Sequence, residues 1–290
     1  MNYYNWIDKN FTSLVGKTVA VSGATGGIGK ELCDYLAHLG ANLICLDRNA
    51  NKSNDLITNL KVKFPSLVAT HITVDLENFD RVSEVGEQLK NLDIDYLILN
   101  AGAYKIPRHK CNTGFDNVFQ INFVSPYYLA RKLYPQIKQK GGKIVAVSSI
   151  AHNYSKIDVN DIDFSSRTAA SKVYGNAKRF LTFSLFGLFG GDETLSIVHP
   201  GITFTNITNH YPKLVFMLIK HPMKIIFMKP KKAALSVIYG ISNGCKHNEW
   251  IGPKLFNVWG LPKKKKLSTA SQTEQDKICE ITESIYIKEQ

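Results

Sequence analysis

The stretch that decides the fold is Ser22-Gly23-Ala24-Thr25-Gly26-Gly27-Ile28-Gly29. It follows the short apolar run Thr18–Ser22 and leads into the amphipathic segment Ile28–Leu39, so it joins a predicted strand to a predicted helix. Glycines at such a junction let the backbone turn tightly, and the free N–H groups at the start of the helix favour a negatively charged pyrophosphate. The stretch therefore predicts a dinucleotide-binding turn.

Short aliphatic or β-branched runs alternate with amphipathic segments as far as about residue 200. We predict strands at Thr18–Ser22, Asn42–Leu46, Val68–Val74, Tyr96–Leu99, Lys143–Ser148 and Leu195–Val198. We predict helices near Ile28–Leu39, Ser53–Lys63, Phe79–Leu89, Phe115–Lys138 and Ala169–Leu188, then a pair of short helices over Asn206–Met228 and a helix over Lys231–Ile241. This order is typical of a doubly wound (Rossmann) α/β fold, a parallel sheet with helices on both faces. We expect one domain over residues 1–266 and a weakly amphipathic C-terminal tail over residues 267–290, partly helical and frayed.

Composition excludes several classes of protein. A chain of 290 residues with 44% hydrophobic and 21% charged residues has the balance of a globular protein, not of a disordered or collagenous one. The five cysteines lack metal-ligand spacing, so we expect neither a disulfide framework nor a metal site. The N-terminus lacks the apolar run of a signal peptide, and no segment reaches the roughly 20 apolar residues that span a bilayer. We therefore expect a cytoplasmic protein.

The net charge of +12 is concentrated in one part of the sequence, residues 209–266. Residues 1–208 carry +4, residues 209–266 carry +11 and residues 267–290 carry −3. No recognition motif supports nucleic acid as a partner. Lysines punctuate the apolar runs between residues 213 and 232, which suits either peripheral contact with an anionic membrane or a solvated face.

The spacing Gly23-x3-Gly27-x-Gly29 resembles the TGxxxGIG motif of short-chain dehydrogenases/reductases, with Ser22 in place of the usual threonine. Further landmarks of that family follow in order at the ends of later predicted strands. The resemblance implies cofactor contacts from Ser22, Gly23, Thr25, Gly27, Ile28, Gly29, Asp47, Arg48, Asp75, Leu76, Asn100, Ala101, Gly102, Tyr174, Lys178, Pro200, Gly201 and Thr205. It is nearest to the branch of retinol dehydrogenases and protochlorophyllide reductases, because an acidic insertion, Asp158–Asp163, lengthens the gap before Tyr174.

Four residues match the catalytic tetrad of that family. Tyr174 and Lys178 stand four residues apart and share one helical face, where a cation favours the ionised form of a phenol. Ser149 closes the fifth predicted strand, and Asn122 matches the asparagine that holds a water near the lysine. The resemblance implies hydride transfer between an alcohol and a ketone or aldehyde, with Tyr174 exchanging the proton. The alternative is a non-catalytic NAD(P)-binding sensor or scaffold protein, which would be free to lose the tetrad.

The choice of cofactor rests on two neighbouring residues. The Asp47 carboxylate suits the ribose hydroxyls of NAD and repels the 2′-phosphate of NADP, whereas Arg48 can pair with that phosphate. We favour NAD over NADP. By resemblance we also expect a substrate lid over about residues 206–232 and a homodimer or homotetramer that forms through the helix of Tyr174. Methionines and aromatic residues in the lid suggest a small-molecule alcohol or carbonyl substrate of apolar or amphipathic character.

Overall fold

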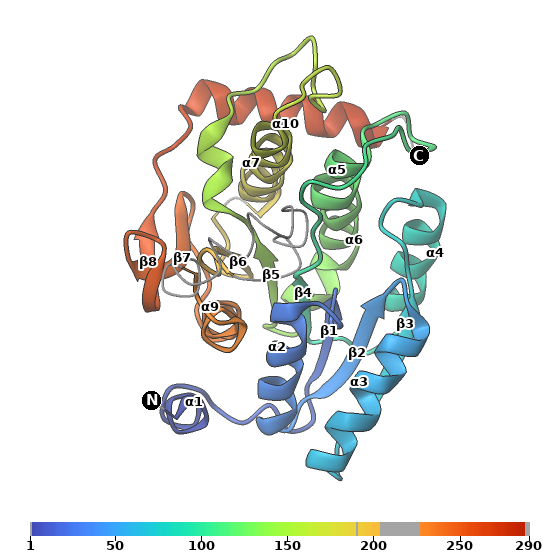
Figure 1. The fold of residues 1–290 in the computed structure, drawn as a ribbon, viewed down its shortest axis with the longest axis vertical. Helices are drawn as coiled ribbons and strands as arrows, with labels where there is room; N and C mark the ends of the chain where they lie inside the picture. The colour runs from blue at the N-terminus through green and yellow to red at the C-terminus, as the bar shows by residue number, and fades with distance from the viewer. Residues whose placement is uncertain (1, 190, 204–226, 288–290) are drawn as a thin grey trace, which may run out of the picture.

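The computed structural model describes residues 2–189, 191–203 and 227–287. An eight-stranded sheet forms its centre, in the order β3-β2-β1-β4-β5-β6-β7-β8 (Figure 1). The strands are β1 Thr18–Ser22, β2 Asn42–Asp47, β3 Ala69–Thr73, β4 Tyr96–Leu99, β5 Lys143–Val147, β6 Leu195–Val198, β7 Glu249–Leu255 and β8 Trp259–Lys266. Neighbours run parallel from β3 to β7, and β8 runs antiparallel to β7. The prediction of a doubly wound α/β fold is confirmed.

Helices cover both faces of the sheet (Figure 1). One face packs against α2 Gly27–His38, α3 Ala50–Lys63 and α9 Pro230–Ser242, with the short helix α1 Tyr3–Asn10 beside α2. The other packs against α4 Phe79–Lys90, α6 Ser125–Gln139 and α7 Ala170–Phe189. A further helix, α10 Gln272–Ile287, lies against α7. The helix predicted at Lys231–Ile241 is thus confirmed as α9.

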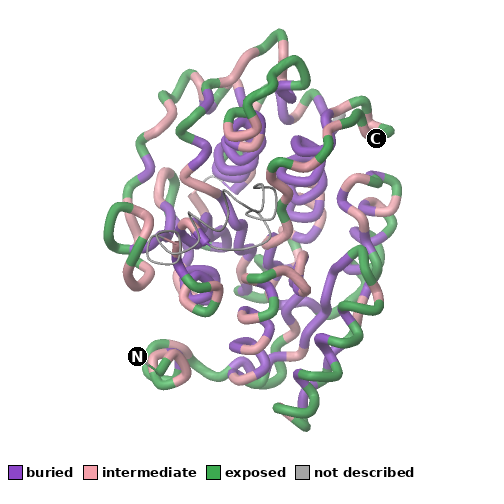
Figure 2. The backbone as a smooth tube through the Cα atoms, in the orientation of Figure 1, coloured by how far each residue is buried: buried purple, intermediate pink, exposed green. Residues whose placement is uncertain are grey.

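The residues expected to form a frayed tail instead build an outer layer. Figure 2 shows α7 buried over most of its length, because the sheet covers one side of it and α10 packs on another. Ile278, Ile281 and Ile285 of α10 are buried in the same core as the phenylalanines of α7. The apolar surface of α7, the helix through which an oligomer was expected to form, is therefore covered in part within the chain, and it carries no argument for an oligomer.

The long helix predicted over residues 115–138 is interrupted. It begins as α5 Asn117–Phe119, continues as the π-helical turn η1 Gln120–Val124 and then becomes α6. Pro126 has no N–H to donate to the carbonyl of Asn122, so the hydrogen-bond ladder loses a rung here. The chain forms a wider, π-helical turn here, in which the backbone N–H of Ser125 donates to the carbonyl of Gln120, five residues back.

Four elements were not predicted: α1, the short helix η2 Ile150–Tyr154, β7 and β8. The run Lys263–Lys266 belongs to β8 and pairs with β7. A strand of consecutive lysines with Pro262 beside them has no alternating pattern, and such sequences are tolerated at the edge of a sheet, where β8 lies.

Part of the expected lid, residues 206–226, and the cofactor contact Thr205 lie outside the described residues. Within the described part of the chain, no helix is long and apolar enough to cross a membrane.

A buried ion pair joins α10 to α7. The Arg179 side chain is only 2% exposed, and it donates from Nε and Nη2 to the carboxylate of Glu274 at 2.7 and 2.6 Å. Its remaining donors reach the backbone oxygens of His152 and Thr269 at 3.0 and 2.8 Å. Every side of the guanidinium thus has an acceptor. Because the positive charge of Arg179 is buried, its stability depends on the negative charge of Glu274.

We expect Glu274→Ala to lower the free energy of unfolding by about 3 kcal/mol, because it leaves the Arg179 charge buried and unpaired. Urea denaturation followed by circular dichroism measures this loss. The matched control is Glu280→Ala on the same helix, whose exposed pair with Lys277 should contribute less than about 0.5 kcal/mol. Equal losses in the two variants would contradict the role of the buried pair.

Candidate active site

The candidate site lies where the strand order reverses, between the carboxyl ends of β1 and β4. A cavity of about 720 Å³ opens there, between the glycine-rich turn, the ends of β2 to β6, and α7. The expected residues that line it are Gly23, Thr25, Gly27, Ile28, Asp47, Arg48, Asp75, Leu76, Asn100, Ala101, Gly102, Ser149, Tyr174, Lys178, Pro200 and Gly201. The fold thus brings together landmarks that are up to 178 positions apart in the sequence.

Two glycines of the turn have no room for a side chain. Gly23 has φ +67°, and a Cβ atom there would lie 2.9 Å from the Cα of Ala101. A Cβ atom on Gly29 would lie 2.1 Å from the carbonyl oxygen of Gly23. No side chain caps the start of α2, where Gly26, Gly27 and Ile28 face the cavity. These uncapped amides at a helix N-terminus fit the pyrophosphate of a dinucleotide.

Ser22 and Asn100 join the ends of β1 and β4. The Ser22 hydroxyl accepts hydrogen bonds from the backbone N–H groups of Asn100 and Ala101, each at 3.1 Å. The Asn100 side chain donates to the backbone oxygens of Ser22 and Gly23 at 3.1 and 3.0 Å. Ser22 and Gly29 were expected to contact the cofactor, but neither lines the cavity. Both shape the turn from behind.

Asp47 is the last residue of β2, and its carboxylate lies in the cavity wall. Its oxygens accept hydrogen bonds from the backbone and hydroxyl of Thr25, at 3.1 and 2.8 Å, and from the Ser53 hydroxyl at 3.2 Å. Arg48 and Lys52 line the same end of the cavity. Lys52 was missed by the sequence analysis, although its place in the first turn of α3, directly after β2, could have indicated it.

Tyr174, Ser149 and Lys178 meet at the cavity surface. Burial raises the pKa of Tyr174 to about 12, and a hydrogen bond with the Ser149 hydroxyl opposes that rise. Burial lowers the pKa of Lys178 to about 7. Its Nζ atom donates to the backbone oxygen of Val147 at 2.8 Å and lies 5.8 Å from the centre of the Tyr174 ring.

Lys178 is not among the groups that shift the pKa of Tyr174 in this arrangement, so the expectation that it lowers that pKa stays a prediction. The ammonium group bonds to the β5 backbone, and removal from water dominates the charge state of both groups.

The structure also separates the two adjacent serines at the end of β5. The Ser148 hydroxyl points into the core and bonds to the hydroxyl of Thr182 at 2.7 Å. Ser149 lies in the cavity wall and caps the short helix η2 Ile150–Tyr154 through the N–H of Ala151. Both serines border the cavity, but the Ser148 hydroxyl is engaged by Thr182, which favours Ser149 as the partner of a substrate oxygen.

Asn122 lies in the π-helical turn behind the cavity. Its side chain bonds to the backbone N–H and carbonyl of Ala103 at 3.2 and 2.8 Å and to the carbonyl of Val118 at 2.8 Å. A Cβ atom on Gly102 would lie 2.8 Å from the Asn122 oxygen and 3.6 Å from Nζ of Lys178. Asn122 thus holds the loop after β4 against the lysine without lining the cavity itself.

His152 does not line the cavity. It is fully buried, and its ring bonds through Nδ1 to the carbonyl of Ser149 and through Nε2 to the hydroxyl of Thr269, at 2.6 and 2.8 Å. Because a carbonyl can only accept, Nδ1 carries the proton and Nε2 accepts. Burial lowers its pKa to about 4, so the ring is neutral at pH 7 and belongs to the structural frame of the site.

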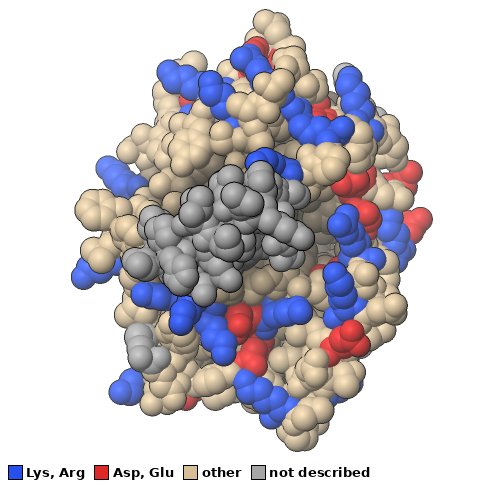
Figure 3. All heavy atoms as spheres, viewed as in Figure 1, with Lys and Arg blue, Asp and Glu red and all other residues tan. Residues whose placement is uncertain are grey.

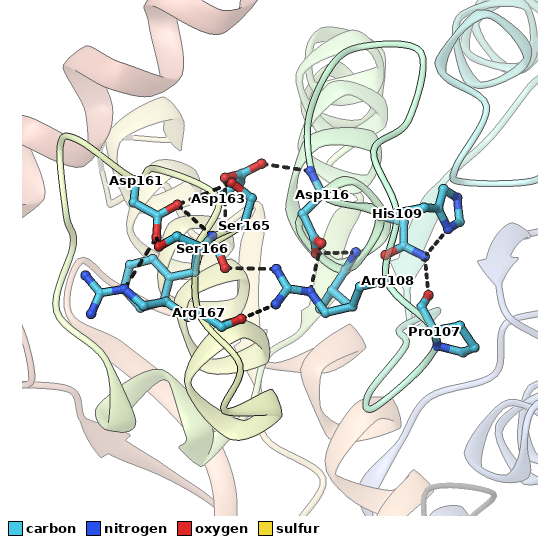
Figure 4. A network of polar contacts seen from close by, with 12 residues as sticks. Pro107, Arg108, His109, Asp116, Asp161, Asp163, Ser165, Ser166 and Arg167 are labelled. Carbon is cyan, nitrogen blue, oxygen red and sulfur yellow. Dashed lines mark hydrogen bonds and ion pairs between the residues drawn. The ribbon is translucent and has the colours of Figure 1, made fainter.

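Two loops that flank the cavity are tied together by Arg108. Figure 4 shows Arg108 between Asp116 on its own loop and the loop that carries Arg167. Its guanidinium donates to the Asp116 carboxylate at 2.8 Å and to the backbone oxygens of Phe164, at 2.8 Å, and Arg167. Asp158 and Asp161 of the acidic insertion pair with Arg167.

These loops and the segments beside them supply wall residues that the sequence did not indicate: Tyr104, Ile106, Tyr154, Ser171 and Phe227. The Tyr104 ring meets the Tyr174 ring edge to face, with centroids 5.4 Å apart.

A glycine turn, a carboxylate at the end of β2 and a tyrosine in the cavity wall beside a buried lysine define a dinucleotide-binding α/β enzyme. Comparisons with known proteins identify its family. The family model described as short chain dehydrogenase matches residues 17–161, so the chain belongs to that family and is an oxidoreductase that acts on CH–OH groups with NAD(P).

Similar proteins include human polyprenol dehydrogenase and human retinol dehydrogenase 13. The first is 25% identical over 77% of this chain and 72% of that protein, and the second is 28% identical over 68% and 62%. The fold is shared with an uncharacterised protein from Mycobacterium paratuberculosis, with a TM-score of 0.74, 20% identity and 96% of each chain covered.

The neutral ring of His152 makes stability depend on pH. Its pKa in the folded protein lies below the ordinary 6.5, so the unfolded chain binds the proton first as the pH falls. The stabilisation is complete above pH 6.5 and is lost as the pH falls from 6.5 towards 4. We expect His152 to account for a loss of about 2 kcal/mol in unfolding free energy between pH 7 and pH 5.

Urea denaturation of the wild type and His152→Gln at both pH values tests this expectation. The variant should be less stable at pH 7 but should lose about 2 kcal/mol less on acidification. Parallel losses in the two proteins would show that His152 does not carry the effect.

Proposed function

We propose that this protein interconverts an apolar or amphipathic alcohol and its ketone or aldehyde, with Tyr174, Ser149, Lys178 and Asn122 as the working tetrad. The observation that carries the proposal is that Tyr174, Ser149 and Lys178 line one cavity together with the glycine-rich turn, with Nζ of Lys178 5.8 Å from the centre of the Tyr174 ring.

Each member of the tetrad has a distinct task. A bound nicotinamide supplies or accepts the hydride. Tyr174, whose pKa of about 12 keeps it protonated at neutral pH, donates its proton to the carbonyl oxygen during reduction and takes it back during oxidation. Ser149 donates a hydrogen bond to the same oxygen, where charge develops.

Lys178 and Asn122 stand behind these two groups. Lys178 binds the ribose of the dinucleotide, and its pKa of about 7 allows it to exchange a proton near neutrality. Asn122 anchors the water through which that proton passes.

The cavity wall and the relatives support the proposed substrate class. Beyond the tetrad, Tyr104, Ile106, Ile150, Tyr154 and Phe227 present aromatic and aliphatic surface. Such a wall suits an apolar chain or ring better than a sugar. Polyprenol dehydrogenase and retinol dehydrogenase 13 are named for long isoprenoid alcohols, and polyprenol and retinol are therefore suitable first substrates.

NAD is the preferred cofactor in this proposal. The Asp47 carboxylate is buried in the wall, where Thr25 and Ser53 hold it in place. A 2′-phosphate at that position would meet this fixed negative charge, whereas ribose hydroxyls can donate to it. Arg48 is exposed and its charge is screened by solvent, so it offsets the repulsion only in part.

We expect Tyr174→Phe to reduce turnover of retinol or polyprenol on the order of 10²- to 10⁴-fold, because the variant has no proton to exchange. Binding of NADH, measured by fluorescence, should change little. Ser149→Ala should reduce turnover by about 10²-fold. The matched control is Ser148→Ala, whose hydroxyl bonds inside the core, and its turnover should stay within about twofold of the wild type. Full activity of Tyr174→Phe would refute the assignment.

We expect the wild type to bind NADH at least about tenfold more tightly than NADPH, because of the charge on Asp47. Asp47→Asn keeps an oxygen for Thr25 but removes that charge, so the ratio of the two dissociation constants should fall towards one. Arg48→Ala should move the ratio the other way. Fluorescence titration of each protein with both cofactors measures the ratio, and an unchanged ratio in Asp47→Asn would exclude its role.

A further inference from the structure

The β7–β8 hairpin ends in a turn that displays an aromatic side chain to solvent. The turn consists of Phe256, Asn257 and Val258, between Leu255 and Trp259, which pair across the hairpin. Phe256 and Asn257 have φ of +50° and +58°. Asparagine tolerates this left-handed conformation, but a bulky residue such as phenylalanine adopts it at a cost.

The turn is held firmly in this strained form. The N–H of Val258 donates to the carbonyl of Leu255 at 2.9 Å. Nζ of Lys265 donates to the Asn257 side chain at 2.7 Å and to the backbone oxygen of Pro253. The Phe256 side chain is nevertheless 83% exposed, so the strain brings no burial in return. Strain that folding does not require is a sign of function.

Apolar side chains gather at this turn. Leu255 is 52% and Trp259 is 39% exposed, so three of the nine exposed large hydrophobic residues in the described part of the chain adjoin one another here. An aromatic cluster at the tip of a hairpin can insert to a shallow depth between lipid headgroups.

The charge of the hairpin has one sign. Residues 250–266 contain five lysines and no acidic residue, and Lys254, Lys263 and Lys266 are exposed. Glu249, the one acidic residue of the two strands, stands opposite Lys266 in the strand register, at the end of the hairpin away from the turn. In Figure 3 the margin of the molecule over β7 and β8, on the left, carries basic and uncharged side chains.

We propose that the tip of the β7–β8 hairpin, Leu255, Phe256 and Trp259 with Lys254 and Lys263, docks the protein on an anionic membrane surface. Charge complementarity favours a membrane over a second copy of this chain. In a two-fold interface the lysines of one copy would face those of the other, whereas acidic lipids would neutralise them.

Docking at this tip would place the cavity near the bilayer. Gly201 lines the cavity, and a Cβ atom there would lie 3.1 Å from Pro253 and 3.2 Å from the carbonyl of Val258. The base of the turn therefore borders the cavity wall. An apolar substrate dissolved in the membrane could then pass directly from the bilayer into the cavity. This consequence rests on the proposed function, whereas the docking itself does not.

Co-sedimentation of the full chain with vesicles tests the proposal. We expect binding to phosphatidylcholine vesicles that contain about 30 mol% phosphatidylserine, and loss of binding on pure phosphatidylcholine or at high salt. Phe256→Asn should reduce the bound fraction at least about fivefold while preserving or raising the unfolding midpoint, because asparagine suits the left-handed turn. The double variant Lys254→Glu/Lys263→Glu should abolish the dependence on phosphatidylserine.

The matched controls change residues near β3, at the other edge of the sheet from β8. Val62→Asn removes an exposed apolar side chain from α3, and Lys61→Glu/Lys90→Glu reverses two exposed charges on α3 and α4. Both should bind vesicles as the wild type does. The proposal is overturned if the wild type does not sediment with acidic vesicles, if Phe256→Asn binds equally well, or if sedimentation velocity shows a dimer that Phe256→Asn dissociates. None of these results depends on catalytic activity.

Discussion

The close approach of the ends of β1 and β4 is the constraint on which the site depends. Gly23 lies against Ala101 with no room for a Cβ atom, and the Ser22 hydroxyl holds two N–H groups of the opposite strand end. Because the sheet reverses its order at this point, the crevice opens between these two strands and nowhere between β1 and β2. This contact fixes the start of α2 and the loop after β4. Asn122 bonds to that loop and holds it against Lys178 of α7.

Burial decides the charge state of the site once it has formed. Desolvation acts on both Tyr174 and Lys178, and their pKa values move apart, to about 12 and about 7. The tyrosine stays protonated and the lysine titrates near neutral pH. A second buried cation, Arg179, lies next along α7, but Glu274 neutralises it. The consecutive residues Lys178 and Arg179 thus differ in role. The helix α7 directs Lys178 towards the cavity, whereas it directs Arg179 towards α10, where the ion pair with Glu274 is structural.

Much of this could be read from the sequence, because the signals are local. Six strands and most helices follow from periods of two and 3.6 residues, and the landmarks at the strand ends have fixed spacings. The sequence did not predict the elements whose structure depends on contacts with a distant part of the chain. Lys263–Lys266 becomes a strand only because β7 offers a ladder, and residues 272–287 become a packed helix because α7 leaves an apolar face for them. The π-helical turn required knowing that Pro126 breaks the ladder at Asn122.

The sequence by itself determined the fold class, and it indicated the glycine-rich turn and the proposed catalytic residues Tyr174, Lys178 and Ser149, since each of these signals rests on a local pattern in the chain. Only the tertiary structure decided which groups face the cavity: it turned Ser148 inward, moved Ser22 and Gly29 behind the turn, and brought Lys52 and Tyr104 into the wall. It also decided that +11 between residues 209 and 266 is partly displayed on one exposed hairpin. The physical reason is that exposure and desolvation depend on packing between distant segments, which local spacing does not encode.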